Sequence, residues 1–350
     1  MLEEFHPIIR EDILEVAAAP LPWEQLRGRS VLITGANGFL ASYMCLTLLA
    51  LNDLHTLGIQ VLGLVRNEER ARSRFGPLLT RGDLKLITQD VTAPLSLELC
   101  ADILVHAASQ ASPKYYTVDP VGTISANAVG TYNLLRRAVD IRASRLLFFS
   151  SSEVYGHVAD GSIMDERNFG SLDPIQVRNC YAESKRAGEA LCASFHRQFN
   201  LSTCIVRPFH TYGPGMDLAD GRVFADFVRN IVEHQDIRMN SEGLARRAFC
   251  YLKDATEGFF TVLLKGEPGM AYNIGNPDEE YSIRQLAETL VDIFPERGLK
   301  VASADPKSVN KESLSTVMRS KPNIERARSL GWNPSTTVRE GFSRTIRSFE

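Results

Sequence analysis

The sequence has little of what marks metal-binding, disulfide-stabilised or membrane-spanning proteins. Its six cysteines lie scattered in apolar segments without paired C-x-x-C spacing, which indicates reduced core thiols and predicts no metal site. The apolar run over residues 44–51 falls well short of the ~20 residues needed to cross a bilayer. Glu3 and Glu4 stand where a signal peptide would carry basic residues. We therefore expect a cytoplasmic protein without a membrane partner.

The chain also lacks an excess of charge of either sign. Its 39 Lys and Arg residues against 42 Asp and Glu residues leave a formal net charge of -3, so no basic field points to nucleic acid. Local groups must then hold any anionic substrate. An apolar content of 44% over 350 residues suits a large α/β enzyme, or a nucleotide-binding domain with a smaller lobe.

Short apolar, β-branched runs alternate with helix-length segments along the first two thirds of the chain. The runs predict strands at Ser30–Thr34, Gln60–Val65, Leu84–Thr88, Ile103–His106, Arg145–Ser150 and Ser202–Val206. Helical spacing lies between most of them, notably over residues 39–51, 121–139 and 181–199. This alternation predicts a Rossmann-type doubly wound parallel sheet, covered by helices on both faces.

Beyond Pro208 the alternation gives way to loops marked by glycine and proline, which predict a smaller lobe carrying part of the substrate site. We divide the chain into an N-terminal extension (1–27), a dinucleotide-binding domain (28–206) and a mainly substrate-binding lobe (207–350). Some of the last segment can return to the sheet. The extension carries no motif that we can interpret.

A glycine-rich turn follows the first predicted strand. It reads Thr34-Gly35-Ala36-Asn37-Gly38-Phe39-Leu40-Ala41 and has the first two glycines of a dinucleotide-binding loop. Gly35 permits a tight turn, Gly38 lets the backbone approach a pyrophosphate, and the N-terminus of the following helix attracts its charge. The expected cofactor is a nicotinamide dinucleotide, held here by Gly35, Asn37, Gly38, Phe39 and Leu40.

The second strand ends without the acid that normally binds the ribose 2′-hydroxyl. Arg66 stands there instead, where it could pair with a 2′-phosphate and favour NADP, or simply face solvent in a basic stretch. The choice between NAD and NADP stays open. Asp90 and Val91 are placed to meet the adenine, and small residues after the fourth strand allow close passage of the cofactor, namely Ala107, Ala108 and Ser109. His106 before them is expected to be a packed strand residue.

Tyr181 and Lys185 open the predicted helix over residues 181–199, and a spacing of four places both on one face. A phenol is normally too weak an acid to ionise near neutral pH, and only its phenolate can act as a base. An adjacent ammonium and a cationic nicotinamide ring favour the phenolate. The pair therefore predicts a general base that acts on a hydroxyl.

These motifs stand in an order that resembles the extended short-chain dehydrogenase/reductases over roughly residues 30–276, and among them the UDP-glucuronate decarboxylases. The stretches that carry the resemblance are Ala111-Ser112-Pro113 with Tyr116 and Pro120; Asn127 with Gly130-Thr131; Ser152-Glu153-Val154-Tyr155-Gly156; Arg178 to Glu189; Thr211-Tyr212-Gly213-Pro214; Asp220-Gly221-Arg222-Val223; and Arg247 with Phe249-Cys250-Tyr251.

The resemblance implies a reaction cycle on a nucleotide-sugar. Tyr181 takes the proton of the C4 hydroxyl as hydride passes to NAD, the C4 ketone makes the C5 carboxylate a β-keto acid, carbon dioxide leaves, and the hydride returns. It adds Ser151, Ser152, Glu153 and Arg247 to the catalytic residues, and Asn127, Tyr181 and Lys185 to the cofactor site. It implies a homodimer built on the helices at 121–139 and 181–199, and substrate contacts from Pro113, Tyr116, His210, Arg222, Val223 and Arg247.

Two departures from that pattern leave the substrate open. His210 replaces the usual asparagine, and Ser241-Glu242-Gly243 replaces a Gly-Asp-Gly. A nucleotide-sugar 4-epimerase remains an alternative because it needs only the Tyr181–Lys185 pair, and an NADPH-dependent 4-keto-sugar reductase remains one because Arg66 favours NADPH. A 4,6-dehydratase is disfavoured because Ser152 stands where an acid is needed. A non-catalytic cofactor-binding regulator is disfavoured because Tyr181 and Lys185 are both intact.

Overall fold

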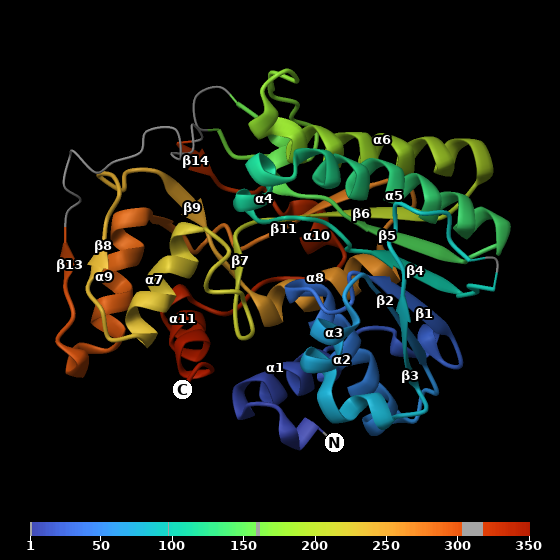
Figure 1. Cartoon of the computed structure of the whole chain (residues 1–350), viewed down its shortest axis with the longest axis horizontal. Helices are drawn as coiled ribbons and strands as arrows, with labels where there is room; N and C mark the ends of the chain where they lie inside the picture. The colour runs from blue at the N-terminus through green and yellow to red at the C-terminus, as the bar shows by residue number, and fades with distance from the viewer. Residues whose placement is uncertain (1, 97, 159–161, 303–317) are drawn as a thin grey trace.

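The computed structural model describes residues 2–96, 98–158, 162–302 and 318–350. Its centre is a seven-stranded sheet in the order β11-β6-β5-β4-β1-β2-β3, with every neighbouring pair parallel (Figure 1). The strands are β1 (Ser30–Thr34), β2 (Gln60–Val65), β3 (Leu84–Thr88), β4 (Ile103–His106), β5 (Arg145–Phe149), β6 (Thr203–Pro208) and β11 (Ala271–Ile274). The predicted doubly wound α/β fold is confirmed.

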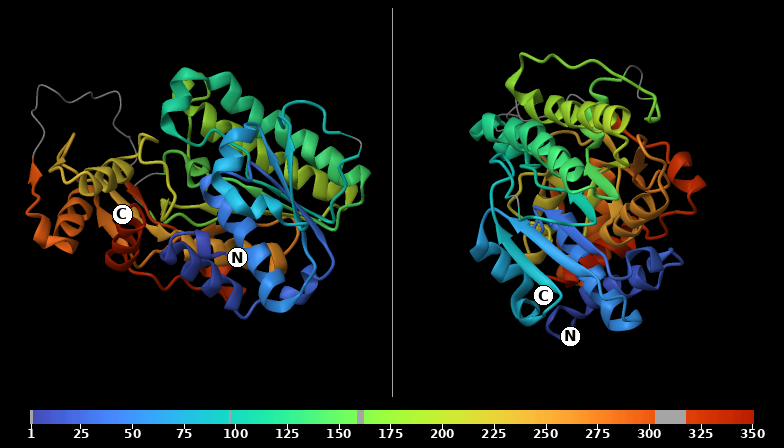
Figure 2. Two further views of the ribbon diagram at one scale, coloured as in Figure 1. Left: turned by 60° about the horizontal axis from the view of Figure 1, so that its bottom comes forward. Right: turned by 90° about the vertical axis from the view of Figure 1, so that its right-hand side faces the viewer.

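Helices cover both faces of this sheet. On one face lie α5 (Pro120–Asp140) and α6 (Cys180–Phe199), and on the other lie α2 (Phe39–His55) and α8 (Leu252–Lys265) (Figures 1 and 2). Alternate side chains of one strand reach the two layers, since successive residues of a strand point to opposite faces. In β1, Val31 and Ile33 join the core beneath α2 and α8, whereas Leu32 joins the core beneath α5 and α6.

The six predicted strands are all present, and two of them end at slightly different residues. The strand expected at Arg145–Ser150 ends at Phe149, and that expected at Ser202–Val206 runs over Thr203–Pro208. The seventh strand, β11, comes from beyond residue 206 and pairs with β6. Part of the C-terminal segment thus returns to the sheet.

The rest of the C-terminal segment forms a smaller lobe with its own apolar core. Its helices pack around Tyr212, Phe249 and Phe342, and the rings of Tyr212 and Phe342 stack at 3.8 Å between centroids. The elements of this lobe are α7 (Val223–Val232), α9 (Ile283–Ile293), α11 (Val338–Arg347), β7 (Thr211–Tyr212), β8 (Ile237–Arg238), β9 (Arg246–Ala248), β10 (Cys250–Tyr251), β12 (Glu280–Ser282), β13 (Val301–Ala302) and β14 (Arg319–Ser320).

Three shorter α-helices also lie within the described residues: α3 (Glu68–Phe75), α4 (Pro113–Val118) and α10 (Glu325–Ser329). Turns of 3₁₀ helix lie at Leu2–Glu4, Trp23–Leu26, Gly76–Thr80, Ser152–Tyr155, Val177–Asn179 and Pro295–Arg297. The turn at Ser152–Tyr155, called η4 below, follows β5 and carries part of the candidate site.

The N-terminal extension forms a helix, α1 (Pro7–Ala18), that packs against α2 and α8. Proline stands at the first helical position, and Ile13, Val16 and Ala17 are buried, as helical spacing on one face requires. The extension is therefore part of the apolar core that lies beneath α2 and α8.

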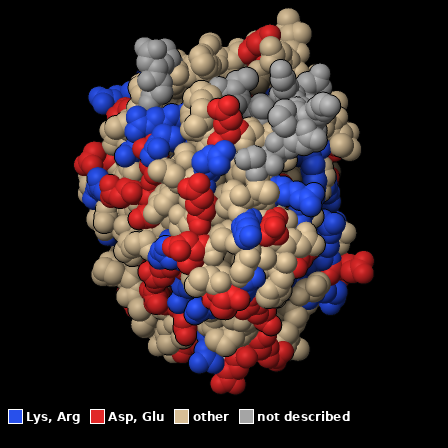
Figure 3. Space-filling model, turned by 90° about the vertical axis from the view of Figure 1, so that its left-hand side faces the viewer, with Lys and Arg blue, Asp and Glu red and all other residues tan. Residues whose placement is uncertain are grey.

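The burial of the cysteines and the charges on the surface can be compared with the expectations from the sequence. Five cysteines are buried, as expected of core thiols, but Cys100 is exposed because it lies in the loop before β4; all six are free. None of the helices within the described residues is long and apolar enough to span a membrane. Figure 3 shows basic and acidic side chains interspersed over one face of the molecule.

Candidate active site

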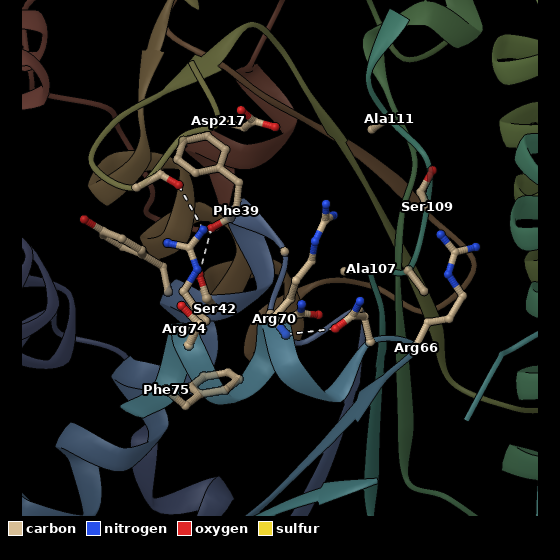
Figure 4. Close-up of a pocket in the computed structure, with 18 of the residues that line it drawn as sticks. Phe39, Ser42, Arg66, Arg70, Arg74, Phe75, Ala107, Ser109, Ala111 and Asp217 are labelled. Carbon is tan, nitrogen blue, oxygen red and sulfur yellow. Dashed lines mark hydrogen bonds between the residues drawn. The ribbon is translucent and has the colours of Figure 1, made fainter. Parts of the chain in front are cut away.

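A cavity of about 900 Å³ opens where the strands β1, β2 and β4 end (Figure 4). The glycine loop, α3, the segment after β4 and the loop at 215–220 form most of its wall, and Phe5 and His6 of the extension close one side. Ligands of open parallel sheets bind outside the carboxyl ends of the strands. The cavity therefore lies where a dinucleotide is expected.

The glycine loop is tight at Gly35, which lies against the segment after β4, and at Gly38, where a Cβ atom would lie 2.9 Å from the carbonyl oxygen of Gly35. Gly35 has φ +64°, and a Cβ atom there would lie 2.8 Å from the Cα atom of Ala108. Gly38 donates its N–H to the carbonyl oxygen of Gly35 and directly precedes α2. The loop thus presents the N-terminus of α2 to the cavity, which is a suitable place for a pyrophosphate.

Most of the predicted cofactor residues meet at this cavity. They are Gly35, Asn37, Gly38, Phe39, Arg66, Asp90, Val91, Ala107, Ala108 and Ser109. Leu40 instead packs against the core beneath α2. His106 is a packed strand residue, as predicted. It is buried, its Nδ1 atom shares a hydrogen bond with the Thr34 hydroxyl at 2.8 Å, and burial lowers its pKa to about 3.

The remaining cofactor candidates lie on α5 and α6, outside the lining of the cavity. Tyr181 is 5% exposed and Lys185 2% exposed, and the Lys185 ammonium lies 5.7 Å from the centroid of the Tyr181 ring. Lys185 Nζ donates to the carbonyl oxygen of Phe149 at 2.6 Å. Asn127 Nδ2 donates to the Ser184 hydroxyl at 3.0 Å, while its buried Oδ1 has no partner among the described residues.

Burial shifts the pKa of both members of the Tyr-Lys pair. It raises the pKa of Tyr181 to about 12, with a further rise from the charge of Glu153 and an opposing hydrogen bond with Ser151. It lowers the pKa of Lys185 to about 7. A bound cation beside the phenol would favour its ionised form, so the base depends on the cofactor.

Aromatic and basic side chains enclose Tyr181. The ring of Tyr116 stacks on that of Tyr181 at 4.9 Å and 15°, and the guanidinium of Arg178 lies 5.1 Å above the centroid of Tyr116. Arg178 also pairs with Glu153 at 3.4 Å. Sequence patterns predicted Tyr116 as a substrate contact, but its buried stacking shows that it also fixes the position of the catalytic ring.

The predicted catalytic residues come from both lobes. Ser151 precedes η4 and accepts a hydrogen bond from the backbone N–H of Glu153, and Ser152 begins η4. Arg247 lies on β9 in the smaller lobe and is 8% exposed. Burial lowers the pKa of Arg247 to about 10, against an opposing effect of the Glu153 charge. Glu153 and Arg247 thus interact across the junction of the lobes.

A second polar group lies near Arg247. His210 is half-buried, its buried Nε2 atom has no partner among the described residues, and its ring lies 6.1 Å from that of Phe249. Burial, followed by the charges of Arg247 and Arg222, lowers the pKa of His210 well below its usual range. His210 therefore offers a neutral imidazole to this side of the site.

The last predicted substrate residues, Pro113, Arg222 and Val223, lie close in the chain to cavity-lining residues but do not line the cavity themselves. Arg222 donates to the carbonyl oxygen of Ala111 at 2.9 Å. Pro113 begins α4 and Val223 begins α7. Ser112 donates to the carbonyl oxygen of Asp220, so the two loops are held together.

Comparisons with known proteins agree with this geometry. A model of the NAD dependent epimerase/dehydratase family matches residues 31–275. The chain belongs to this family. UDP-glucuronic acid decarboxylase 6 of Arabidopsis thaliana is 34% identical over 314 residues, which cover 89% of this chain and 86% of that protein. UDP-glucuronic acid decarboxylase 1 of Xenopus tropicalis is 33% identical over 325 residues, which cover 92% of this chain and 72% of that protein.

Solved structures of the epimerase/dehydratase family share the fold. A UDP-glucuronic acid 4-epimerase from Bacillus cereus, in complex with UDP-glucuronic acid and NAD, superposes with a TM-score of 0.76 at 21% identity over 91% of this chain and 98% of that one. A dTDP-glucose 4,6-dehydratase from Streptomyces venezuelae with NAD bound gives 0.76 at 25% identity over 91% and 96%. The chain is thus an enzyme of an NAD-dependent family, as its motifs predict.

The residues present fit such a cofactor at its pyrophosphate. The close approach of Gly35 to Ala108 and the N-terminus of α2 leave room and positive potential for two phosphates. The adenosine end differs from an ordinary NAD site, because Arg66 replaces an acid.

Three groups around the site were not predicted. Phe5 and His6 line the cavity although they come from the extension, and no motif in the sequence indicated this. Arg70 also lines the cavity, and its place one turn after Arg66 was a usable signal. Arg178 was noticed only as part of a matching stretch, and its contacts with Tyr116 and Glu153 depend on the fold.

Proposed function

We propose that this enzyme modifies nucleotide-sugars and converts a UDP-hexuronic acid, such as UDP-glucuronate, into the corresponding UDP-pentose. The reaction proceeds by oxidation at C4, loss of carbon dioxide and reduction at C4. The observation that carries the proposal is the buried Arg247, whose charge is balanced in part by Glu153 next to the Tyr181 site. The similarity to UDP-glucuronic acid decarboxylases supports it.

The first step of the proposed reaction needs a base and a hydride acceptor. A bound nicotinamide would supply the acceptor, and later the donor, of the C4 hydride. Tyr181 removes the proton of the C4 hydroxyl, and the Lys185 side chain, whose Nζ lies 5.7 Å from the centroid of the Tyr181 ring, favours the phenolate when it is protonated. Ser151, which bonds to Tyr181, is placed to share the hydroxyl of the substrate.

The second step needs positive charge where the enolate forms. Arg247 is buried, and with a pKa of about 10 it stays protonated at neutral pH. A cation with little water around it interacts strongly with an anion, so it can offset the substrate carboxylate and then the enolate that carbon dioxide leaves behind. The charge of Glu153, which pairs with Arg178 at 3.4 Å, offsets part of the Arg247 charge.

Nothing in these contacts favours dehydration. Expulsion of the 6-hydroxyl needs an acid, and Ser152 offers only a hydroxyl there. A 4-epimerase would need Tyr181 and Lys185 alone, and it would leave the buried Arg247 without a role.

The charge of Arg247 can be tested against that of its neighbour. Arg246 lies on the same strand, points to the more exposed side and pairs with Glu280 at 3.6 Å. We expect Arg247→Ala to lower the release of carbon dioxide from UDP-glucuronate by about 10²–10³ in kcat. Arg246→Ala should stay within about threefold of the parent, since exposed ion pairs contribute little. Trapped carbon dioxide and product mass are measured together.

Tyr181→Phe is the companion variant, and we expect its kcat to be lower by a factor of about 10²–10⁴. It should form neither reduced nicotinamide nor carbon dioxide, whereas Arg247→Ala can still reduce nicotinamide. A parent product of unchanged mass would show epimerisation, and a product that gained two hydrogens would show a reductase. Either result would overturn the decarboxylase proposal.

A further inference from the structure

The cavity carries two arginines at the place where the adenosine ribose of a dinucleotide lies. Arg66 directly follows β2, and Arg70 stands one turn later on α3. Both side chains extend upward into the cavity in the view of Figure 4. The carboxyl end of this strand is where a Rossmann fold reads the ribose 2′ position.

The other two arginines of this stretch have protein partners. Arg72 pairs with Glu68 at 2.7 Å on the exposed side of α3, and Arg74 donates to the carbonyl oxygen of Gly215 at 3.0 Å. Within the described residues, the guanidinium groups of Arg66 and Arg70 form no hydrogen bond or ion pair. These two groups are therefore available to a ligand.

The acids near these arginines are already occupied. Asp90 accepts hydrogen bonds from the backbone and hydroxyl of Thr92, both at 2.8 Å, and these bonds, followed by the charge of Arg66, lower the pKa of Asp90. Glu68 is held by Arg72. Glu69, the other carboxylate of α3, does not line the cavity, so the acid that usually accepts the ribose hydroxyl at the end of β2 has no counterpart on this wall.

We propose that the cavity binds the 2′-phosphate of NADP between Arg66 and Arg70, and that this chain prefers the phosphorylated cofactor over NAD. Arginine has only donors, and its fork matches phosphate oxygens. A ribose hydroxyl would leave both guanidinium groups at the cavity without an anionic ligand, whereas a phosphate carries about two negative charges and can accept hydrogen bonds from both. A cofactor that is recycled within each turnover works equally well with either form.

The proposal rests on the cofactor site of the proposed function, but its test uses no substrate, so the two can fail separately. Calorimetry of the purified full-length protein gives the Kd values of NADP and NAD. We expect NADP to bind at least about 10-fold more tightly, a difference that charge-assisted hydrogen bonds readily supply. Equal affinities, or tighter binding of NAD, would overturn the proposal without any variant being needed.

Variants then assign the preference to residues. Arg66→Ala and Arg70→Ala should each weaken NADP by about 10-fold and NAD by less than about twofold, because only the 2′-phosphate is lost to them. Arg72→Ala is the matched control on the same helix and should change neither affinity. Arg66→Asp should reverse the preference. Equal losses for the two cofactors in the Arg66 and Arg70 variants would contradict the assignment.

Discussion

Tyr181 and Lys185 are both buried, and burial shifts their pKa values in opposite directions. Each shift disfavours the charged form that the reaction needs, a phenolate on one side and an ammonium on the other. Strongly shifted pKa values of this kind are common in active sites, where bound ligands supply further charges. In the cofactor-free protein the pair should therefore lower stability.

Lys185 allows this cost to be measured. Its pKa of about 7 in the folded chain lies below the ordinary 10.5, so the unfolded chain takes up this proton at a higher pH than the folded chain. The contribution of Lys185 to the free energy of unfolding is therefore highest above pH 10.5 and decreases as the pH falls toward 7. Lys185→Met removes the charge and also the bond to Phe149. We expect the free energy of unfolding of cofactor-free protein to rise by about 2 kcal/mol near pH 6, and by less near pH 9, while activity is lost.

Denaturant unfolding at the two pH values gives the answer. Lys265→Met is the control, since this lysine is exposed on α8 and should show the same small change at both. A loss of stability in Lys185→Met that is equal near pH 6 and near pH 9 would show that burial does not strain this lysine.

At this scale the sequence predicted the site because each motif ties a residue type to a backbone position. Gly35 and Gly38 take the conformations that their motif requires, and Tyr181 lies beside Lys185 as a spacing of four implies. It did not predict the contacts of Phe5 or Arg178, because these join segments far apart in the chain. Such contacts exist only after folding.

Among the elements, α1 joins parts of the molecule that are distant in sequence. Asp12 of α1 is fully buried and accepts hydrogen bonds from Tyr251 at 2.7 Å, Tyr43 at 3.3 Å and Arg344 at 2.7 Å. These partners lie on β10, α2 and α11. One carboxyl group thus connects the extension, the dinucleotide-binding domain and the smaller lobe.

Asp12→Ala should destabilise the protein by about 3 kcal/mol, because it leaves buried hydroxyls and a guanidinium without their acceptor. Glu11→Ala is the matched control, since the exposed Glu11 pairs with the same Arg344 at 3.2 Å and its loss should cost less than about 1 kcal/mol. Denaturant unfolding measures both variants. If the two lose equal stability, α1 is not joined to the lobes through Asp12.

The elements that were predicted and those that were missed differ in a physical way. Most of the six predicted strands are buried on both faces, so they appear as apolar runs; the edge strand β3 is partly exposed. The strand β11 was missed because it contains Asn273, which is buried but bonded to the carbonyl oxygens of Met164 and Asn323 at 2.9 Å. The helix α1 was missed although Pro7 and the spacing of Ile13, Val16 and Ala17 were visible.

In the whole molecule, the candidate site lies where the two lobes meet. The dinucleotide-binding domain supplies Tyr181 and Glu153, and the smaller lobe supplies Arg247 and His210. Neither lobe alone supplies both Tyr181 and the buried Arg247. The homodimer expected from α5 and α6 stays a prediction, although Val121, Ile124 and Tyr132 are exposed apolar residues on α5.

The central claim is that one substrate molecule is oxidised, loses carbon dioxide and is reduced again before it leaves. UDP-glucuronate carrying deuterium at C4 tests this most directly, because the label must pass to the cofactor and return. The account predicts a product lighter by carbon dioxide that keeps nearly all of its deuterium at C4, read by mass spectrometry. A product of unchanged mass, or a decarboxylated product that has lost its deuterium to the cofactor pool, would contradict it.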